Sequence, residues 1–311
     1  MLKRIRANGN PRRDTLRLLI LLAAIPLFRC HPGNKEARQL RSACEGGDAP
    51  ACNKLAVKLQ KGEYVLRDDT RAAKLFDQAC EGGVGEGCAS LGVAYQRGRG
   101  LTRDSVRASN LFREGCDRGA MDGRTSLGVL HSRGAGVQRD VGRAAALFQQ
   151  ACDGGDVDGC AHLGTLYASG EGVGQDFARA AALFQRSCDS TVTTGCLGLG
   201  LLQAAGTGVP RNDSTAAELF NRACDGGEPA GCFQRGVAYE AGLGVTQNFE
   251  RSAELYREAC EDRHGEACAR LAAQYDRGAG VHRQTSRATT FRRRACDYGH
   301  TEACEQPTGS S

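Results

Sequence analysis

Cysteine is the residue type whose number and spacing in this sequence most directly imply chemistry. Of the 311 residues, 16 are cysteine, and eight of these recur at an interval of 36 residues. They are Cys44, Cys80, Cys116, Cys152, Cys188, Cys224, Cys260 and Cys296. A second cysteine follows each of them after eight positions, except that Arg124 stands eight residues after Cys116. Paired cysteines form disulfides or bind metal ions, depending on their spacing and compartment.

The spacing of these pairs favours disulfides over a metal site. Zinc-binding cysteines usually stand two to four residues apart, and the six histidines of the chain do not cluster with the pairs. Seven intervening residues suit a turn between two antiparallel helices, which brings the two Cα atoms to bridging distance. We therefore expect the bridges Cys44–Cys52, Cys80–Cys88, Cys152–Cys160, Cys188–Cys196, Cys224–Cys232, Cys260–Cys268 and Cys296–Cys304. Cys116 is left as a free thiol, and no metal or cofactor is expected.

A unit of 36 residues surrounds each pair, and residues 156–191 illustrate it. Its first half carries an apolar stripe at helical spacing, formed by Cys160, Leu163, Gly164 and Tyr167. A glycine-rich segment, 170–173, then interrupts the helix, and Asp176 is placed to cap a second one. We name the first helix of each repeat helix A and the second helix B. Glycine at the fourth position after the cysteine of helix A predicts that another element presses close there.

Helices of about three turns are marginal in water by themselves, so each must bury its stripe against its neighbours. The sequence therefore predicts an all-α fold, a right-handed superhelical solenoid of αα-hairpins. Seven repeats over 48–299 follow an N-terminal half repeat at 30–47, and a stub at 300–311 ends the chain. Arg292, Arg293 and Arg294 in the seventh helix B predict a polar capping face. The absence of tryptophan and an aromatic content of 5% fit closely packed short helices.

Residues 1–29 have the character of an export leader. A basic stretch ends at Arg17, and an uncharged run from Leu18 to Phe28 follows, which is too short to span a bilayer. The segment from Pro11 to Arg17 has the twin arginines of one bacterial export route, but it departs from that motif at other positions. The leader is strongly basic, whereas the rest of the chain has 34 basic and 35 acidic residues. A nearly neutral body gives no electrostatic case for nucleic-acid binding.

An export leader on a cysteine-rich chain predicts a bacterial periplasm, outer surface or medium, where disulfides persist. Cys30, two residues after the end of the apolar run, matches the lipid-modified cysteine of bacterial lipoproteins, which would anchor the chain to the outer membrane. Arg29 stands where such processing prefers a small residue. Cleavage with release and lipidation at Cys30 therefore both stay open.

The repeated elements L-G-x-x-Y, G-x-G-V and A-x-x-L-F resemble the Sel1-like repeat, a relative of the tetratricopeptide (TPR) repeat. The 36-residue period with cysteines eight apart is similar to the Helicobacter cysteine-rich protein family. The resemblance covers about 48–304 and departs from the pattern at Arg124, at 62–65, and at Arg235-Gly236. The wider class implies an adaptor that gathers other proteins. The cysteine-rich branch implies penicillin binding or weak β-lactamase-like hydrolysis.

The residues that such hydrolysis would need are absent from the sequence. No serine is followed by lysine three positions later, the spacing a serine β-lactamase uses to activate its nucleophile. The histidines fall in different repeats without a zinc motif, so we expect them to be solvated surface residues. The glycine loops recur between helices with no preceding strand, which argues against phosphate binding. We expect a binding protein, with a β-lactam hydrolase as the alternative.

The remaining candidate is the face of helix A that points away from the buried stripe. Its second, fifth and ninth positions after the cysteine should be exposed. The candidate groove residues are Lys54, Lys61, Arg97, Arg133, His162, Gln234, Arg270 and Arg277. They predict a groove that is basic at its ends and neutral in the middle. We expect it to bind a protein, a peptide or an extended cell-envelope ligand such as a peptidoglycan-related chain, with the solenoid monomeric. A solvated face without a ligand remains the alternative.

Overall fold

The computed structural model describes residues 32–190 and 192–304. Within these residues the chain forms fifteen α-helices and one short 3-10 helix, and no strand. The predictions made for the leader, for Cys30 and for the last part of the C-terminal stub fall outside the described residues. No described helix is both long enough and apolar enough to cross a lipid bilayer.

Each repeat contributes two helices of 13 residues joined by a glycine-containing loop. The A helices are α3 (Ala49–Lys61), α5 (Gly85–Arg97), α7 (Met121–Arg133), α9 (Val157–Ser169), α11 (Thr193–Ala205), α13 (Pro229–Ala241) and α15 (Gly265–Arg277). The B helices are α4 (Asp69–Glu81), α6 (Ser105–Asp117), α8 (Val141–Asp153), α10 (Phe177–Asp189), α12 (Asp213–Asp225), α14 (Phe249–Glu261) and α16 (Thr285–Asp297). The half repeat supplies α2 (Pro32–Glu45), and the 3-10 helix η1 (Thr301–Ala303) follows α16.

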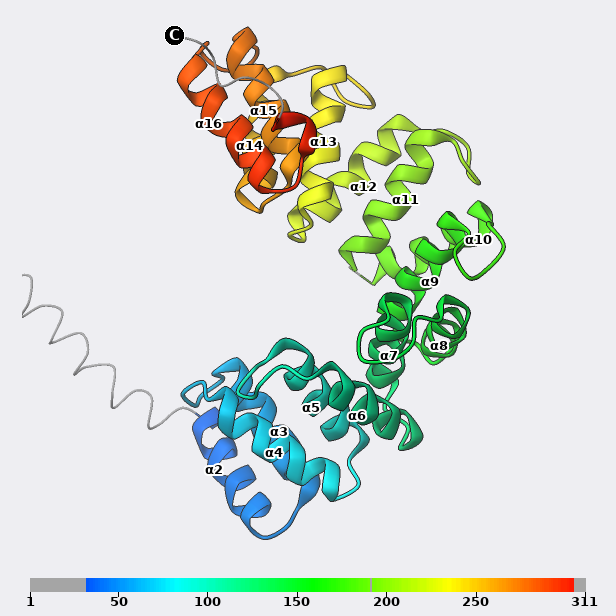
Figure 1. Cartoon of the computed structure of the whole chain (residues 1–311), viewed down its shortest axis with the longest axis vertical. Helices are drawn as coiled ribbons and strands as arrows, with labels where there is room; N and C mark the ends of the chain where they lie inside the picture. The colour runs from blue at the N-terminus through cyan, green and yellow to red at the C-terminus, as the bar shows by residue number, and fades with distance from the viewer. Residues whose placement is uncertain (1–31, 191, 305–311) are drawn as a thin grey trace, which may run out of the picture. The chain divides into compact units, whose positions relative to one another are not determined.

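The chain divides into two compact units. Unit 1 extends to Leu130 and includes Gly134–Gln138, and unit 2 comprises His131–Arg133 and the chain from Arg139 onward. From α2 to α6 in unit 1, and from α8 to α16 in unit 2, helices that follow one another in sequence lie side by side as hairpins (Figure 1). This arrangement confirms the predicted all-α hairpin solenoid.

Local signals start and stop the helices as the sequence predicts. Asp176 accepts a hydrogen bond from the backbone N–H of Arg179 at 3.0 Å, and an aspartate or asparagine caps most other B helices in the same way. The A helices end at a glycine in the left-handed conformation, such as Gly170 with φ of 75°.

The second glycine of each loop lies against the B helix of the preceding repeat. A Cβ built on Gly208, whose φ is 72°, would stand 2.5 Å from the backbone carbonyl carbon of Phe177. Only glycine combines this left-handed conformation with so close an approach. Repeat one has Tyr64 at the equivalent place, and it adopts the same conformation with φ of 58°. The loop shape is therefore kept where the glycine is missing.

The glycines within the A helices admit aromatic rings from helix B of the same repeat. A Cβ on Gly164 would meet the Phe184 ring at 2.9 Å, and a Cβ on Gly236 would meet the Tyr256 ring at 2.7 Å. Phe184 is only 4% exposed, and Tyr256 is fully buried. The close approach expected at this position is confirmed, and the element that approaches is an aromatic side chain.

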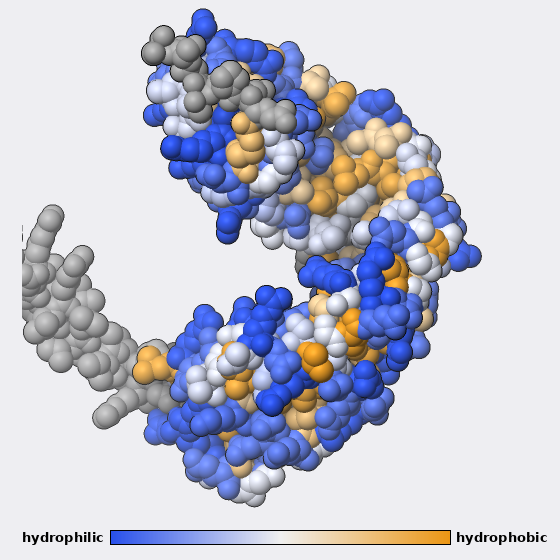
Figure 2. Space-filling model, viewed as in Figure 1, coloured by the Kyte–Doolittle hydropathy of each residue, from blue (hydrophilic) through white to orange (hydrophobic). Residues whose placement is uncertain are grey.

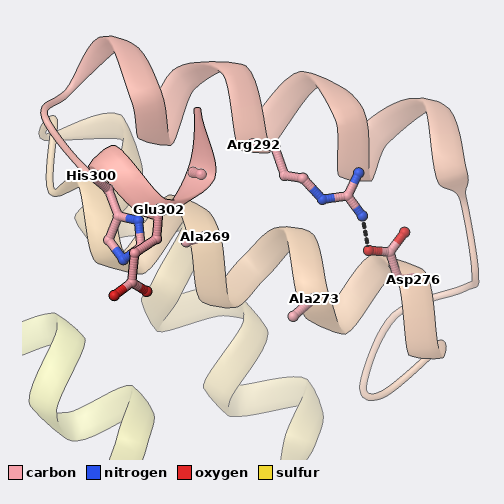
Figure 3. A pocket seen from close by; sticks show the side chains of 7 residues that line it. Ala269, Ala273, Asp276, Arg292, His300 and Glu302 are labelled. Atoms are coloured by element: carbon pink, nitrogen blue, oxygen red, sulfur yellow. Dashed lines mark hydrogen bonds and ion pairs between the residues drawn. The ribbon is translucent and has the colours of Figure 1, made fainter. Parts of the chain in front are cut away.

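The seventh repeat closes its unit with polar residues. Arg292 occupies the position of the buried aromatic ring in other repeats, and it forms an ion pair with Asp276 of α15 (Figure 3). Beside this pair lies a cavity of about 110 Å³, with His300 and Glu302 at its other end. Among the described residues of α16, only the two alanines Ala288 and Ala295 are buried. The polar face predicted for a capping repeat is present.

Candidate functional site

Six disulfides join the end of α2, or of a helix B other than α6 and α16, to the start of the next helix A, and a seventh joins the end of α16 to Cys304 directly after η1. The pairs are Cys44–Cys52, Cys80–Cys88, Cys152–Cys160, Cys188–Cys196, Cys224–Cys232, Cys260–Cys268 and Cys296–Cys304. Their Cα–Cα distances run from 4.4 Å to 5.0 Å. These are the pairs that the hairpin geometry led us to expect. Each bridge ties one repeat to the next across a turn of seven residues.

A side chain from the following repeat reaches several of these bridges. This side chain lies on helix B, two residues before the cysteine that ends that helix. Arg186 Nη1 lies 3.6 Å from Cys152 Sγ, and a carboxylate oxygen of Glu258 lies within 4.8 Å of both sulfurs of Cys224–Cys232. Gln78 Oε1 lies 3.8 Å from Cys44 Sγ. The sequence reasoning missed this contact, because it depends on how successive repeats stack.

Cys116 is the free cysteine of the described residues, and it is only partly exposed. Its turn keeps the geometry of the bridged turns, since Ala120 donates a backbone hydrogen bond to Gly115 at 2.9 Å. Burial is the main influence on the thiol, and it raises the pKa of Cys116 above its ordinary value. Such a thiol is less readily ionised than an exposed one, so it is a weak nucleophile near neutral pH.

The candidate groove residues lie on the A helices as predicted from their positions. Lys54, Lys61, Arg97, Arg133, Arg270 and Arg277 are exposed, and His162 and Gln234 are partly buried. The first three belong to unit 1 and the others to unit 2.

Glu240 changes the charge expected at the C-terminal end of the groove. Its carboxylate accepts a hydrogen bond from Arg277 at 3.1 Å and pairs with Arg270 at 3.7 Å. The hydroxyl of the buried Tyr256 donates to the same carboxylate at 2.7 Å. Arg270 also pairs with Glu266 at 3.8 Å. The two arginines are therefore largely balanced by acids on α13 and α15, so the expectation of a basic C-terminal end was wrong.

The fifth position after the cysteine of helix A is apolar in every repeat but the fourth, and the charge-based interpretation did not use it. The residues there are Val57, Val93, Val129, Thr165, Leu201, Val237 and Ala273. In unit 2, Leu201 is 42% exposed, and Leu243 of the following loop is 40% exposed. Figure 2 shows apolar side chains gathered over α11–α13. Between α12 and α13 lies a cavity of about 80 Å³, with Val237, Phe220 and Leu243 in its wall.

The expectation that the histidines are solvated surface residues was wrong for three of them. His131 is only 6% exposed. His162 stacks on Phe148 with ring centroids 4.9 Å apart, and His264 stacks on Phe233 at 4.7 Å. Burial lowers the pKa of both His162 and His264 below the ordinary value. These imidazoles fill space between helices.

In the described residues, the acids beside sulfur atoms do not make a metal site. Glu114 approaches Cys80 and Cys88, as Glu258 approaches Cys224 and Cys232, but the four sulfurs are bonded in disulfides. A disulfide sulfur lacks the thiolate charge that binds zinc.

The repeated hairpins, the bridged turns and the exposed face of helix A define a class of protein, a disulfide-stapled helical repeat array. The Sel1 repeat model matches seven consecutive segments of the chain. They are 49–84, 85–119, 123–156, 157–191, 194–228, 229–264 and 265–300. The chain belongs to the Sel1 repeat family.

Two solved structures with TM-scores of 0.67 and 0.65 have the same fold, and a third structure is similar over less of the chain. A protective antigen present in uropathogenic Escherichia coli strains is 26% identical with a TM-score of 0.67, covering 86% of this chain and 57% of its own. A Sel1 repeat protein from Oxalobacter formigenes is 24% identical with a TM-score of 0.65, and the match covers 86% of this chain and 78% of that protein. The cysteine rich protein B of Helicobacter pylori is 25% identical with a TM-score of 0.35, and the match covers 42% of this chain and 93% of that protein. No curated protein matches the chain.

Proposed function

We propose that the chain is an exported scaffold that binds a protein partner through the exposed face of its A helices. The observation that carries the proposal is the apolar surface on α11–α13, where Leu201 and Leu243 are each at least 40% exposed. A contiguous apolar surface on a soluble protein commonly marks an interaction site. We use the name α11–α13 surface for the exposed or partly exposed apolar residues of α11, α13 and the loop after α13, which are Leu201, Ala205, Val237, Ala241 and Leu243.

The chemistry of this surface favours an extended polypeptide with aliphatic side chains. The cavity of about 80 Å³ beside Val237 and Leu243 has room for a small aliphatic group. Gln234 lines the same cavity and offers an amide donor and acceptor to a peptide backbone. The balanced charges around Glu240 give no preference for an acidic partner over a neutral one.

A displayed library of random peptides tests this proposal directly. The wild-type protein should enrich peptides that carry a small aliphatic residue, and Leu201→Ser should lose most of that enrichment. Val106→Ser is the matched control, because Val106 is 57% exposed but lies on α6, a B helix. Enrichment that survives Leu201→Ser and Leu243→Ser would remove the α11–α13 surface from the proposal.

Seven disulfides fit an oxidising compartment, since thiols of cytosolic proteins are kept reduced. Together with the leader, this supports export to the bacterial periplasm or cell surface. Mass spectrometry of the mature protein tests the route, because it distinguishes cleavage with release from a lipid on Cys30. A protein that retains residues 1–29 in the cytoplasm would contradict export.

A further inference from the structure

Two bridges of unit 2 have the same local construction but opposite charges against them. Cys152–Cys160 and Cys224–Cys232 both join a helix B to the next helix A, and all four cysteines are at most 4% exposed. At the first, Arg186 Nη1 donates to Cys152 Sγ at 3.6 Å. At the second, the carboxylate of Glu258 lies within 4.8 Å of both sulfurs.

We propose that the side chain two residues before each helix B cysteine tunes how readily the bridge of the preceding repeat is reduced. Arg186 then speeds the reduction of Cys152–Cys160, and Glu258 slows the reduction of Cys224–Cys232. Arg186 stands 34 residues after Cys152, and Glu258 stands 34 residues after Cys224. The register is therefore the same, and only the charge differs.

The chemistry of thiol–disulfide exchange gives the direction of each effect. A thiolate of a dithiol reductant attacks Cys160 Sγ and forms a mixed disulfide, and Cys152 leaves as a thiolate that then takes a proton. The second thiol of the reductant breaks the mixed disulfide, which releases Cys160 and leaves the reductant oxidised by two electrons. Negative charge is spread over three sulfurs in the transition state, so a guanidinium at Cys152 stabilises it and a carboxylate destabilises it.

Other bridges provide intermediate cases along the same chain. At Cys80–Cys88, Arg118 Nη1 lies 3.2 Å from Cys88 Sγ, but Glu114 approaches the same sulfurs and pairs with Arg118 at 2.7 Å. The opposite charges there largely cancel. Gln78 beside Cys44–Cys52 is neutral. The charge two residues before the helix B cysteine thus differs from repeat to repeat, while the spacing of the bridged cysteines is the same.

Faster reduction of Cys152–Cys160 would weaken one segment of the chain, residues 116–160. The turn from Cys116 to Arg124 has no bridge, and Cys152–Cys160 closes the next turn along the chain. Reduction of Cys152–Cys160 would leave two successive turns without a covalent tie, and the A and B helices there would open more easily. The bridge beside Glu258 would open more slowly under the same conditions.

Reduction resolved bridge by bridge tests the proposal. The oxidised, exported protein carrying Cys116→Ser is exposed to limiting dithiothreitol at low salt, quenched with acid, alkylated and mapped by mass spectrometry. Arg186→Gln should slow the opening of Cys152–Cys160 by about threefold, the scale of a partly solvated charge interaction. Glu258→Gln should speed the opening of Cys224–Cys232 by a similar factor. Glutamine is the matched replacement, because Gln78 and Gln150 occupy this position in other repeats.

Both turns also carry acids, Asp153, Asp156 and Asp158 in one and Asp225 and Glu228 in the other. Each variant is therefore compared with the wild type at the same bridge, and Cys296–Cys304 serves as the unaffected reference. High salt should shrink both changes, since it screens charge and not local opening. Unchanged rates in both variants would overturn the proposal. So would an effect of Arg186→Gln on Cys188–Cys196 instead of Cys152–Cys160.

Discussion

The ring of Phe184 lies directly over Gly164, so that a Cβ at Gly164 would stand 2.9 Å from the ring carbon Cδ1. Phe184 belongs to helix B and Gly164 to helix A of the same repeat. The pair sets how closely α9 and α10 approach. The seventh repeat has Ala272 in place of the glycine and Arg292 in place of the ring, whereas the first repeat keeps its ring, Phe76, with Ala56 in place of the glycine.

Gly164→Ala should therefore destabilise the array although alanine favours helices. Overpacking against a buried ring costs about 1–3 kcal/mol, which outweighs the gain of about 1 kcal/mol in helix propensity. Urea unfolding followed by circular dichroism measures the loss. Gly174→Ala is the control, because a Cβ there meets nothing within 4 Å. Equal midpoints for the two variants would show that α9 and α10 are not in this contact.

The unbridged turn at Cys116 should be repairable by one substitution. Thiol titration of the denatured, unreduced chain from residue 31 onward is expected to give one equivalent, from Cys116. Arg124→Cys should abolish it, because the turn has the geometry of the bridged ones. Closing a loop of nine residues contributes up to about 2.5 kcal/mol, so resistance to proteolysis at this turn should rise. Two or more equivalents in the unmodified chain would contradict the pairing.

Tyr256 should make the stability of unit 2 fall at high pH. Burial, and next the hydrogen bond to Glu240, raise the pKa of Tyr256 above its ordinary value of 10.0. Because the unfolded tyrosine ionises first, stability that is fully present below pH 10 is lost as the pH rises toward the folded pKa.

Tyr256→Phe removes this dependence. At pH 7 the variant should be less stable by about 1 kcal/mol, since it loses one buried hydrogen bond. Above pH 10 the gap to the wild type should narrow. Urea midpoints across the pH range measure both effects, and a variant that loses stability at high pH as steeply as the wild type would contradict the assignment to Tyr256.

The purified protein should not hydrolyse a chromogenic cephalosporin above the buffer rate. No serine in the sequence has lysine one helical turn later. His131 is buried, and His162 and His264 each stack on a phenylalanine ring, so these imidazoles are not gathered in a site. A rate that scales with protein concentration and survives repurification would restore the hydrolase alternative.

The sequence by itself determined the repeat, the helices and the pairing of the cysteines. These features are local: Cys152 and Cys160 are eight residues apart, and one helical turn and one cap decide whether they meet. Asp176 caps its helix as predicted for the same reason. The seven matched segments of the Sel1 repeat rest on the same short-range pattern.

Only the tertiary structure decided which side chains meet across repeats. Arg186 reaches Cys152, and Arg277 reaches Glu240 from 37 residues away, because stacked repeats are offset by an amount that no single unit encodes. His131 is buried, although it looked exposed from its position in the sequence. The sequence shows that a charged residue occupies a helix position. Its energetic contribution depends more on which residue of the next repeat pairs with it, and on how deeply it is buried, than on which charged residue it is.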